Sequence, residues 1–267
     1  MFLNLFVFFF GLAIGSFLNC VIYRLALPNF SLKNLGGLKS RSFCPHCKQV
    51  LSWQDLIPVF SFLILKGRCR YCQEKISWQY PLVELSTAFL FLLAYNFLPV
   101  PRTSPWYYFY YWTVISFLII IFVYDLKHYL IPDKIIYPAI LIVFAFRIWD
   151  LFLISNFEFR IFNPFISALA AATFFLFIVL ISKGRWMGIG DIKLAFFMGL
   201  FLGFPNILIA LFLSFLIGAI IGIGLILANK KTLKSEVPFG PFLVTGTFIT
   251  LFFGEKIIQH YLNLFIY

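Results

Sequence analysis

The sequence predicts an all-α polytopic membrane protein with about eight transmembrane helices and a small cytoplasmic loop domain. Three observations predict this fold class. Of the 267 residues, 62% are hydrophobic and 12% are charged, whereas a soluble domain averages about 25% charged residues. Long apolar runs recur along the chain, and a helix needs roughly 20 apolar residues to span a bilayer. Four of the five cysteines stand in two CxxC pairs within one basic loop.

The apolar runs mark eight candidate spans. They cover residues 2–23, 82–98, 106–124, 135–153, 164–182, 191–203, 206–228 and 239–262. All should be helices, because an open sheet cannot satisfy its backbone in lipid. The first run has no basic residue before it, unlike a cleavable signal peptide, so we interpret it as an uncleaved span whose N-terminus lies outside. Within it, Gly11 and Gly15 fit the small-residue spacing of closely packed membrane helices, and we expect an intramolecular packing face there.

The distribution of Lys and Arg predicts the orientation. With the N-terminus outside, the inside segments are 24–81, 125–134, 183–193 and 229–238, and they hold 17 of the 21 Lys and Arg residues. Cytoplasmic loops of membrane proteins carry this excess of positive charge. The net charge of +11 would suggest nucleic acid in a soluble protein; here we expect it to reflect topology, with lipid and no nucleic acid as a partner.

The chain therefore divides into three predicted parts. Residues 1–23 form the first transmembrane helix, residues 24–81 a cytoplasmic four-cysteine domain, and residues 82–267 the remaining transmembrane domain. The segment 24–81 is too short to build a large core, so a bound metal would help it to fold.

The two CxxC pairs predict that this domain binds structural zinc. Cys44 and Cys47 are separated from Cys69 and Cys72 by 21 residues, close to the spacing that is typical of paired CxxC zinc sites. Four thiolates close a tetrahedral site and leave no open position for catalysis. Disulfides or free thiols are the alternatives, but a disulfide within a CxxC would be strained and the cytoplasm is reducing. His46 lies inside the first pair, and we do not expect it to be a ligand.

Acidic residues number only ten, so each can be weighed. We expect the following six to be solvated: Asp55, Glu74, Asp150, Glu158, Glu236 and Glu255. Glu84 differs from them because it lies just inside an apolar segment, where a carboxylate must find a partner or stay protonated.

Three aspartates reach the cytoplasmic side in this topology: Asp125, Asp133 and Asp191. Asp125 and Asp191 are 66 residues apart with two spans between them, so they meet at the same membrane face. Two carboxylates at close range share a proton, which lets one act as a general base and the other as a general acid. Gly188 and Gly190 precede Asp191, and they remove side chains that would block a substrate backbone.

Each aspartate taken singly has a simpler explanation. Asp125 and Asp191 could cap helices, since a carboxylate near a helix N-terminus is mildly stabilising. They could also pair with Lys127 and Lys193. A GxGD string alone is therefore weak support for catalysis.

The motifs gain weight because they occur together and in one order. They are Gly11-x3-Gly15-Ser-Phe-Leu-Asn19-Cys-Val-Ile-Tyr-Arg24, Ser42-Phe-Cys44-Pro-His-Cys47, Lys66-Gly-Arg-Cys69-Arg-Tyr-Cys72, Tyr80-Pro-Leu-Val-Glu84-Leu, Asp125 with Ile131-Pro132-Asp133, and Gly188-Ile-Gly190-Asp191-Ile-Lys193. Over nearly the whole chain, the sequence resembles the type IV prepilin leader peptidases, a family of GxGD aspartyl proteases in the bacterial inner membrane. One departure is Ala26, where the family often has proline; it touches none of the residues that carry chemistry.

The resemblance implies a site and a reaction. Asp125 and Asp191 map onto the catalytic pair of the family. The supporting residues that we expect are Asp133, Gly188, Gly190, Lys193 and Glu84. Substrates of the family are prepilins and pseudopilins, which carry a short basic leader, a Gly, usually a Phe, and then an apolar helix. Cleavage follows the Gly on the cytoplasmic side.

A second activity follows from the same resemblance. Many members that keep the four cysteines also methylate the new N-terminal residue, with S-adenosylmethionine as the methyl donor. We expect this activity here. The alternatives are a peptidase that only cleaves, and a non-enzymatic transporter or assembly factor that uses membrane carboxylates for proton or ion passage.

Overall fold

The computed structural model describes residues 2–27, 41–98, 105–153, 162–230, 232 and 237–265. Apart from two isolated β-bridges, the regular structure of these residues is helical. The chain forms two compact units, Met1–Ile120 and Ile121–Tyr267. Glu158 and Glu236, which we expected to be solvated, lie outside the described residues.

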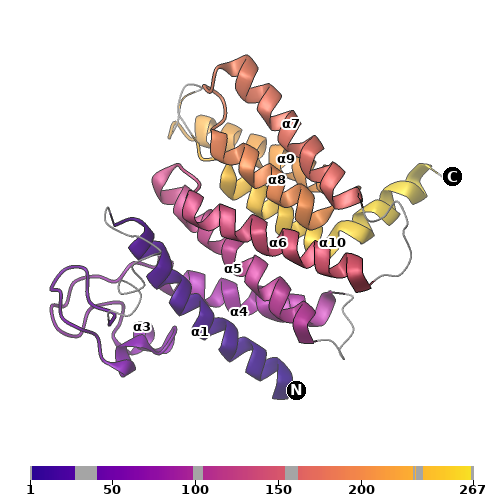
Figure 1. The fold of residues 1–267 in the computed structure, drawn as a ribbon. Helices are drawn as coiled ribbons and strands as arrows, with labels where there is room; N and C mark the ends of the chain where they lie inside the picture. Colours follow the sequence, from indigo (N-terminus) through magenta and orange to yellow (C-terminus); the bar gives the residue numbers. More distant parts are fainter. Residues whose placement is uncertain are drawn as a thin grey trace. The chain divides into compact units, whose positions relative to one another are not determined.

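Eight long helices correspond to the eight expected spans (Figure 1). They are α1 Phe2–Leu25, α4 Gln79–Phe97, α5 Pro105–His128, α6 Asp133–Leu153, α7 Asn163–Ser182, α8 Ile189–Leu202, α9 Asn206–Leu227 and α10 Gly240–Phe265. Among the described residues, six of these helices are long and apolar enough to cross a membrane, all except α6 and α8. The predicted all-α membrane class is therefore confirmed. One difference matters for the site: α5 continues to His128, so Asp125 lies within its last turn instead of at its end.

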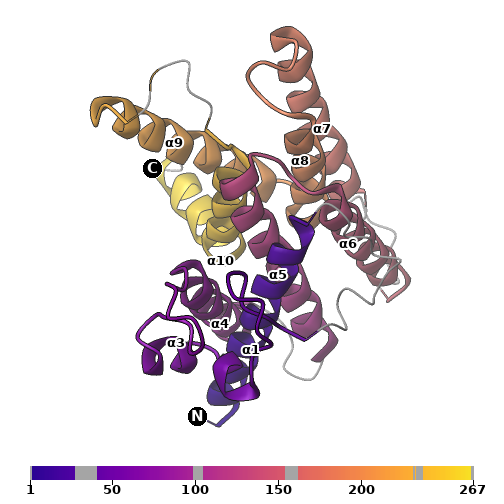
Figure 2. The same cartoon turned by 90° about the vertical axis from the view of Figure 1, so that its left-hand side faces the viewer.

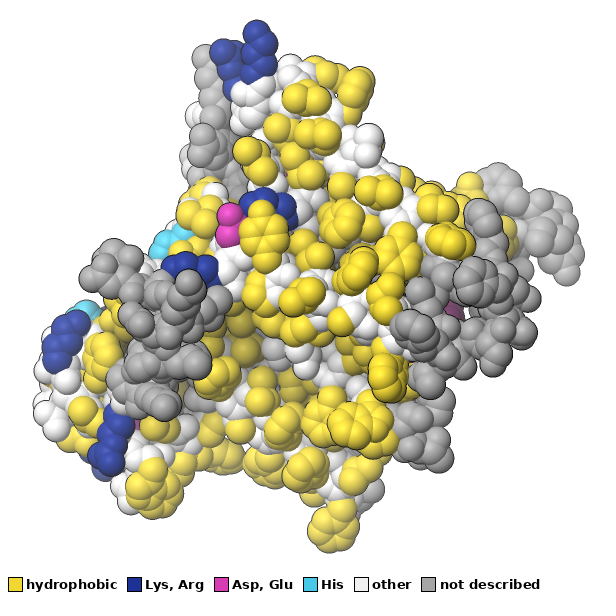
Figure 3. Space-filling view, viewed as in Figure 1, with side chains coloured by type: hydrophobic (Ala, Val, Ile, Leu, Met, Phe, Trp, Pro, Cys, Tyr) yellow, Lys and Arg dark blue, Asp and Glu magenta, His cyan; other side chains and the backbone are white. Residues whose placement is uncertain are grey.

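The surface of these helices is typical of a protein in lipid. It exposes many large apolar side chains, whereas a soluble protein rarely exposes large apolar patches. Helix α7 exposes Ile166, Leu169, Phe174, Phe177 and Leu180. Figure 3 shows hydrophobic side chains covering most of the visible face of α6 and α7. The Phe-rich composition thus supplies a surface that faces acyl chains.

The first unit is built on a close pair of helices, α1 and α4. A Cβ at Gly11 would lie 2.6 Å from the Cα of Ala88, and a Cβ at Gly15 would lie 2.6 Å from the Cα of Glu84. Only glycine permits this approach of backbones. Asn19 of α1 donates from Nδ2 to the carbonyl oxygen of Tyr80 at 3.0 Å. The predicted intramolecular packing face is confirmed.

The second unit contains two further helix pairs that pack closely at glycine, α7 with α8 and α9 with α10. The members of each pair lie side by side in Figures 1 and 2. A Cβ at Gly199 of α8 would lie 2.5 Å from the Cα of Ala168 on α7. A Cβ at Gly246 of α10 would lie 2.5 Å from the carbonyl oxygen of Ala210 on α9. Arg147 of α6 donates to the carbonyl oxygens of Leu200 and Phe201 in the last turn of α8, where a helix supplies no partner of its own.

Substitution of Gly199 tests the packing of α7 on α8. We expect Gly199→Ala to destabilise the protein by about 1–3 kcal/mol, because the new Cβ meets backbone atoms that cannot rotate away. Gly222→Ala is the matched control in the same unit, since nothing lies within 4 Å of its Cβ position. Thermal unfolding in detergent measures both variants. Equal melting temperatures for the two variants would contradict the packing argument.

Candidate functional site

Asp125 is buried near the end of α5, with 4% of its surface exposed. Its Oδ2 atom accepts a hydrogen bond of 3.0 Å from the backbone N–H of Gly240, the first residue of α10. A Cβ at Gly240 would lie 2.5 Å from this oxygen. The carboxylate therefore sits directly against a helix start, at a position where only glycine fits.

Asp191 is held in the same manner at the start of α8. It lies in the first turn, with 8% of its surface exposed. Its Oδ2 atom accepts a hydrogen bond of 3.1 Å from the backbone N–H of Gly188, the N-cap residue of that helix. The predicted capping role of this aspartate is thus present, and it coexists with burial of the carboxylate.

The two aspartates are brought to one place in the second unit by Ile131. The Cβ position of Gly190, next to Asp191, lies 3.1 Å from the Cβ of Ile131. The Cβ position of Gly240, next to Asp125, lies 3.5 Å from the Cδ1 of the same residue. The chain thus gathers three helix termini, from α5, α8 and α10, around two acids.

Asp133 and Lys193 pair with each other instead of joining this buried pair. The Nζ atom of Lys193 lies 2.5 Å from Oδ1 of Asp133 and 4.9 Å from the ring centroid of Tyr137. The side chain of Asp133 is 59% exposed. The alternative in which Lys193 pairs with Asp191 is therefore not what the described residues show.

Glu84 belongs to the first unit and has found a backbone partner. It is 6% exposed, and its Oε2 atom accepts a hydrogen bond of 2.7 Å from the backbone N–H of Val59. Glu84 thus ties the four-cysteine loop to α4.

The four cysteines lie on two copies of one turn. The backbone N–H of Lys48 donates to the carbonyl of Cys44, and the N–H of Gln73 donates to that of Cys69, both at 3.0 Å. Lys48 and Gln73 share a left-handed backbone, with φ of 59° and 58°. Each turn is closed by an isolated β-bridge, Phe43 with Val50 and Arg68 with Lys75. The loop therefore presents two equivalent CxxC knuckles.

The sulfur atoms of the two knuckles converge in the geometry that a tetrahedral metal requires. All four ligand atoms lie within 4.8 Å of one another, and the Sγ atoms of Cys44 and Cys72 are 3.9 Å apart. Sulfurs about 2.3 Å from a tetrahedral zinc are about 3.8 Å apart. His46 is not part of the cluster. The donor set fits zinc.

The thiols also differ in how readily they ionise. Burial opposes ionisation of Cys44, but the backbone N–H groups of Cys47 and His46 outweigh it and lower the pKa of Cys44 to about 7. A hydrogen bond from the backbone of Glu74 favours the Cys72 thiolate, yet desolvation and the neighbouring thiols raise the pKa of Cys72 to about 11. A bound divalent cation would stabilise the thiolate form of all four cysteines together, because each thiolate would then face positive charge.

One expectation for the loop was wrong: Asp55 is not solvated. Its side chain is 3% exposed and pairs with Arg70 at 2.7 Å. It also accepts hydrogen bonds from the backbone and hydroxyl of Ser52. Burial raises the pKa of Asp55, but the hydrogen bonds from Ser52 and Arg70 outweigh it, so the net shift is downward. Because Arg70 lies between Cys69 and Cys72, this pair braces the second knuckle.

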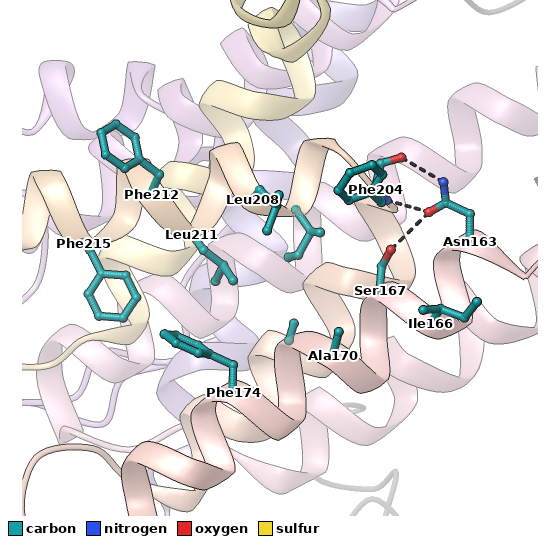
Figure 4. A pocket seen from close by; sticks show the side chains of 12 residues that line it. Asn163, Ile166, Ser167, Ala170, Phe174, Phe204, Leu208, Leu211, Phe212 and Phe215 are labelled. Atoms are coloured by element: carbon teal, nitrogen blue, oxygen red, sulfur yellow. Dashed lines mark hydrogen bonds between the residues drawn. The ribbon is translucent and has the colours of Figure 1, made fainter.

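A cavity of about 500 Å³ lies elsewhere in the second unit, between α7 and α9 (Figure 4). Phe174, Leu208 and Phe212 are among the residues that line it, and its polar end is Asn163, which hydrogen bonds to the backbone of Phe204. Phe204 follows the last turn of α8, whereas Asp191 lies in the first turn. Neither the aspartates nor the cysteines described above are among its lining residues.

Sequence reasoning missed Gly240. Its signal is a Gly-Pro pair at the start of the last span, on the predicted inside face. Such a pair marks a helix N-terminus with a free N–H, since Pro lacks the donor and favours the first turn. The pattern could not reveal which carboxylate that N–H would meet, because Asp125 is 115 residues away.

Comparisons with known proteins agree with the motifs. The bacterial peptidase A24 N-terminal domain matches residues 9–98, and the type IV leader peptidase family matches residues 112–223. Two curated relatives are each named prepilin leader peptidase/N-methyltransferase. The one from Bacillus subtilis (strain 168) is 34% identical over 97% of each chain. The one from Aeromonas hydrophila is 33% identical over 97% of this chain and 94% of the relative. No solved structure matches.

Proposed function

The chain belongs to the type IV leader peptidase family, and we propose that it cleaves the basic leader of prepilins and pseudopilins after a glycine. In this proposal Asp125 and Asp191 are the catalytic pair. The observation that carries it is the burial of both carboxylates around Ile131, each held by a backbone N–H at a helix start.

The pair would work by sharing one proton. The ionised aspartate takes a proton from a water molecule, and the resulting hydroxide attacks the carbonyl carbon of the glycine that ends the leader. The protonated aspartate gives its proton to the carbonyl oxygen of that glycine. The aspartate that took the water proton then gives it to the amine nitrogen, which leaves as the tetrahedral intermediate collapses. The other aspartate takes back a proton from a hydroxyl group of the intermediate, so the pair returns to its singly protonated state. Among the described residues, the hydrogen bonds to each aspartate use only Oδ2, which leaves Oδ1 for water and substrate.

Supporting roles follow from position. A Cβ at Gly188 would meet no atom nearer than 3.9 Å, so the approach to Asp191 is open for a substrate backbone. Asp133 forms an ion pair with Lys193, which keeps this cation away from Asp125 and Asp191. Its exposed carboxylate is also the acidic group available to a basic leader.

Topology completes the proposal. The N-terminus lies outside, and the cysteine domain and both catalytic aspartates lie at the cytoplasmic face of the bacterial inner membrane. The three-part division at residues 23 and 81 remains a prediction. Zinc, held by Cys44, Cys47, Cys69 and Cys72, is structural, since four thiolates complete its coordination.

The second activity is N-methylation of the new N-terminus by S-adenosylmethionine. The names of the relatives and the four-cysteine cluster support it. The alternative is an enzyme that only cleaves. Mass spectrometry of the processed N-terminus separates the two, because methylation adds one methyl group to it.

Replacement of either catalytic aspartate is the first test. We expect Asp125→Asn and Asp191→Asn each to lower prepilin cleavage by at least about 100-fold, since each removes a proton-transfer group. Glu255→Gln is the matched control, because Glu255 is an exposed acid of the same unit. Gel or mass analysis of leader removal by purified protein measures the effect. Retained cleavage in both asparagine variants would refute the catalytic assignment.

Gly240 offers a second test that leaves both carboxylates in place. We expect Gly240→Ala to lower cleavage on the order of 100-fold, because its Cβ would displace the Asp125 carboxylate. Gly224→Ala should be active, since nothing lies within 4 Å of its Cβ position. Initial rates of prepilin cleavage measure the effect, and melting temperatures of the variants serve as a folding control. Wild-type rates for Gly240→Ala would mean that this contact does not position Asp125.

Metal content tests the cysteine cluster. We expect about one zinc per chain in the purified protein, and its loss in Cys69→Ser, because three thiolates no longer close the site. Cys20→Ser should keep the metal, since Cys20 is outside the cluster. Elemental analysis measures this. Equal zinc in Cys69→Ser and wild-type protein would contradict the four-cysteine site.

A further inference from the structure

The short helix α3, Phe60–Ile64, exposes apolar side chains in a loop that we expected to be aqueous. Phe60, Leu63 and Ile64 are 52%, 62% and 74% exposed, while Phe62 is buried. Positions i, i+3 and i+4 share one helix face. The helix therefore turns Phe62 into the loop domain and presents a continuous apolar face outward.

Two contacts hold α3 beside the membrane helix α4. The backbone N–H of Val59, the N-cap of α3, donates to Glu84 at 2.7 Å. The ring of Phe62 packs on that of Trp78, with centroids 4.9 Å apart, and Trp78 directly precedes α4. Glu84 lies five residues after the first residue of α4, about 8 Å along its axis. The start of α3 is thus level with the second turn of a membrane-spanning helix.

A strained turn at Val59 sets this position. Its φ and ψ are 62° and −49°, and the backbone N–H of Phe60 donates to the carbonyl of Pro58 at 2.6 Å. This is a γ-turn of the rare kind, unusual for a β-branched residue. Strain of this type persists only where surrounding contacts maintain it, and here the carboxylate of Glu84 does so. The chain is bent where it meets α4, so that α3 stays beside the start of that helix.

The charged residues around α3 indicate which environment its exposed apolar face contacts. Lys66 and Arg68 follow the helix directly and are exposed. Over residues 41–78 there are six Lys and Arg against two acids, and one of these acids, Asp55, is paired with Arg70. An apolar helix face flanked by basic residues fits an interface of acyl chains and anionic headgroups.

We propose that α3 and Trp78 form an interfacial anchor, in which Phe60, Leu63 and Ile64 insert into the anionic cytoplasmic leaflet. The occupant of this face is the lipid bilayer. The cysteine domain is then fixed on the membrane surface through α3 and α4, and does not extend freely into the cytoplasm. The anchor needs neither catalytic aspartate, so it stands independently of the proposed peptidase activity.

A tryptophan reporter tests the anchor in the full-length protein. Ile64→Trp and the control Gln49→Trp, both at exposed loop positions, are reconstituted in vesicles of phosphatidylglycerol and phosphatidylcholine with or without brominated acyl chains. The added emission of each variant is its spectrum minus that of wild-type protein. We expect bromine to quench at least half of the added emission of Ile64→Trp and little of that of Gln49→Trp. Aqueous iodide should show the reverse order.

Two further measurements distinguish lipid from other occupants. Replacing phosphatidylglycerol by phosphatidylcholine, or adding Lys66→Gln with Arg68→Gln, should reduce bromine quenching of the Ile64→Trp emission at least twofold. Dilution of the protein in lipid should leave the quenching unchanged. Strong iodide quenching of the Ile64→Trp emission would overturn the anchor. Bromine quenching that rises on dilution would assign the face to a second copy of the chain instead.

Discussion

Buried carboxylates must be satisfied inside the protein when the surroundings are lipid, and this constraint organises the structure. Each of three such groups accepts a backbone N–H at the beginning of a helix. Asp125 is bound by the start of α10, Asp191 by the N-cap of α8, and Glu84 by the N-cap of α3. Helix starts offer unpaired N–H groups and a positive dipole end, so they stabilise an acid without bringing in a cationic side chain.

The absence of a cationic side chain from these bonds has a chemical consequence. A lysine against Asp125 or Asp191 would hold that acid permanently ionised, and the pair could not keep the single proton that acid–base chemistry needs. Lys193 lies only two residues from Asp191, but it is engaged by Asp133 and by the ring of Tyr137. In the proposed mechanism, this ion pair with Asp133 keeps the charge of Lys193 away from the buried acids.

Much of the fold and of the candidate site could be predicted from the sequence because the signals are local. Apolar length marks the spans, the CxxC spacing marks the cysteine cluster, and alternation of spans places Asp125 and Asp191 at one face. Gly240 and Val59 were missed because their roles depend on partners far along the chain. Asp55 was assigned wrongly for a related reason: an acid in a polar loop is expected to be solvated, and its pairing with Arg70 exists only after the two knuckles have folded together.

Glycine residues serve both the packing of the helices and the candidate site. In three helix pairs they let backbones meet at distances that a Cβ would forbid, at Gly15, Gly199 and Gly246. At Gly240 the same property admits a carboxylate in place of a neighbouring helix. At this helix start a Cβ would lie 2.5 Å from Oδ2 of Asp125, so the acid is bound at 3.0 Å only because the first residue is glycine. The candidate site therefore uses the same feature as the helix pairs, a glycine that allows close approach. At Gly240 the group that approaches is the side chain of Asp125, whereas in the helix pairs it is the backbone of a neighbouring helix.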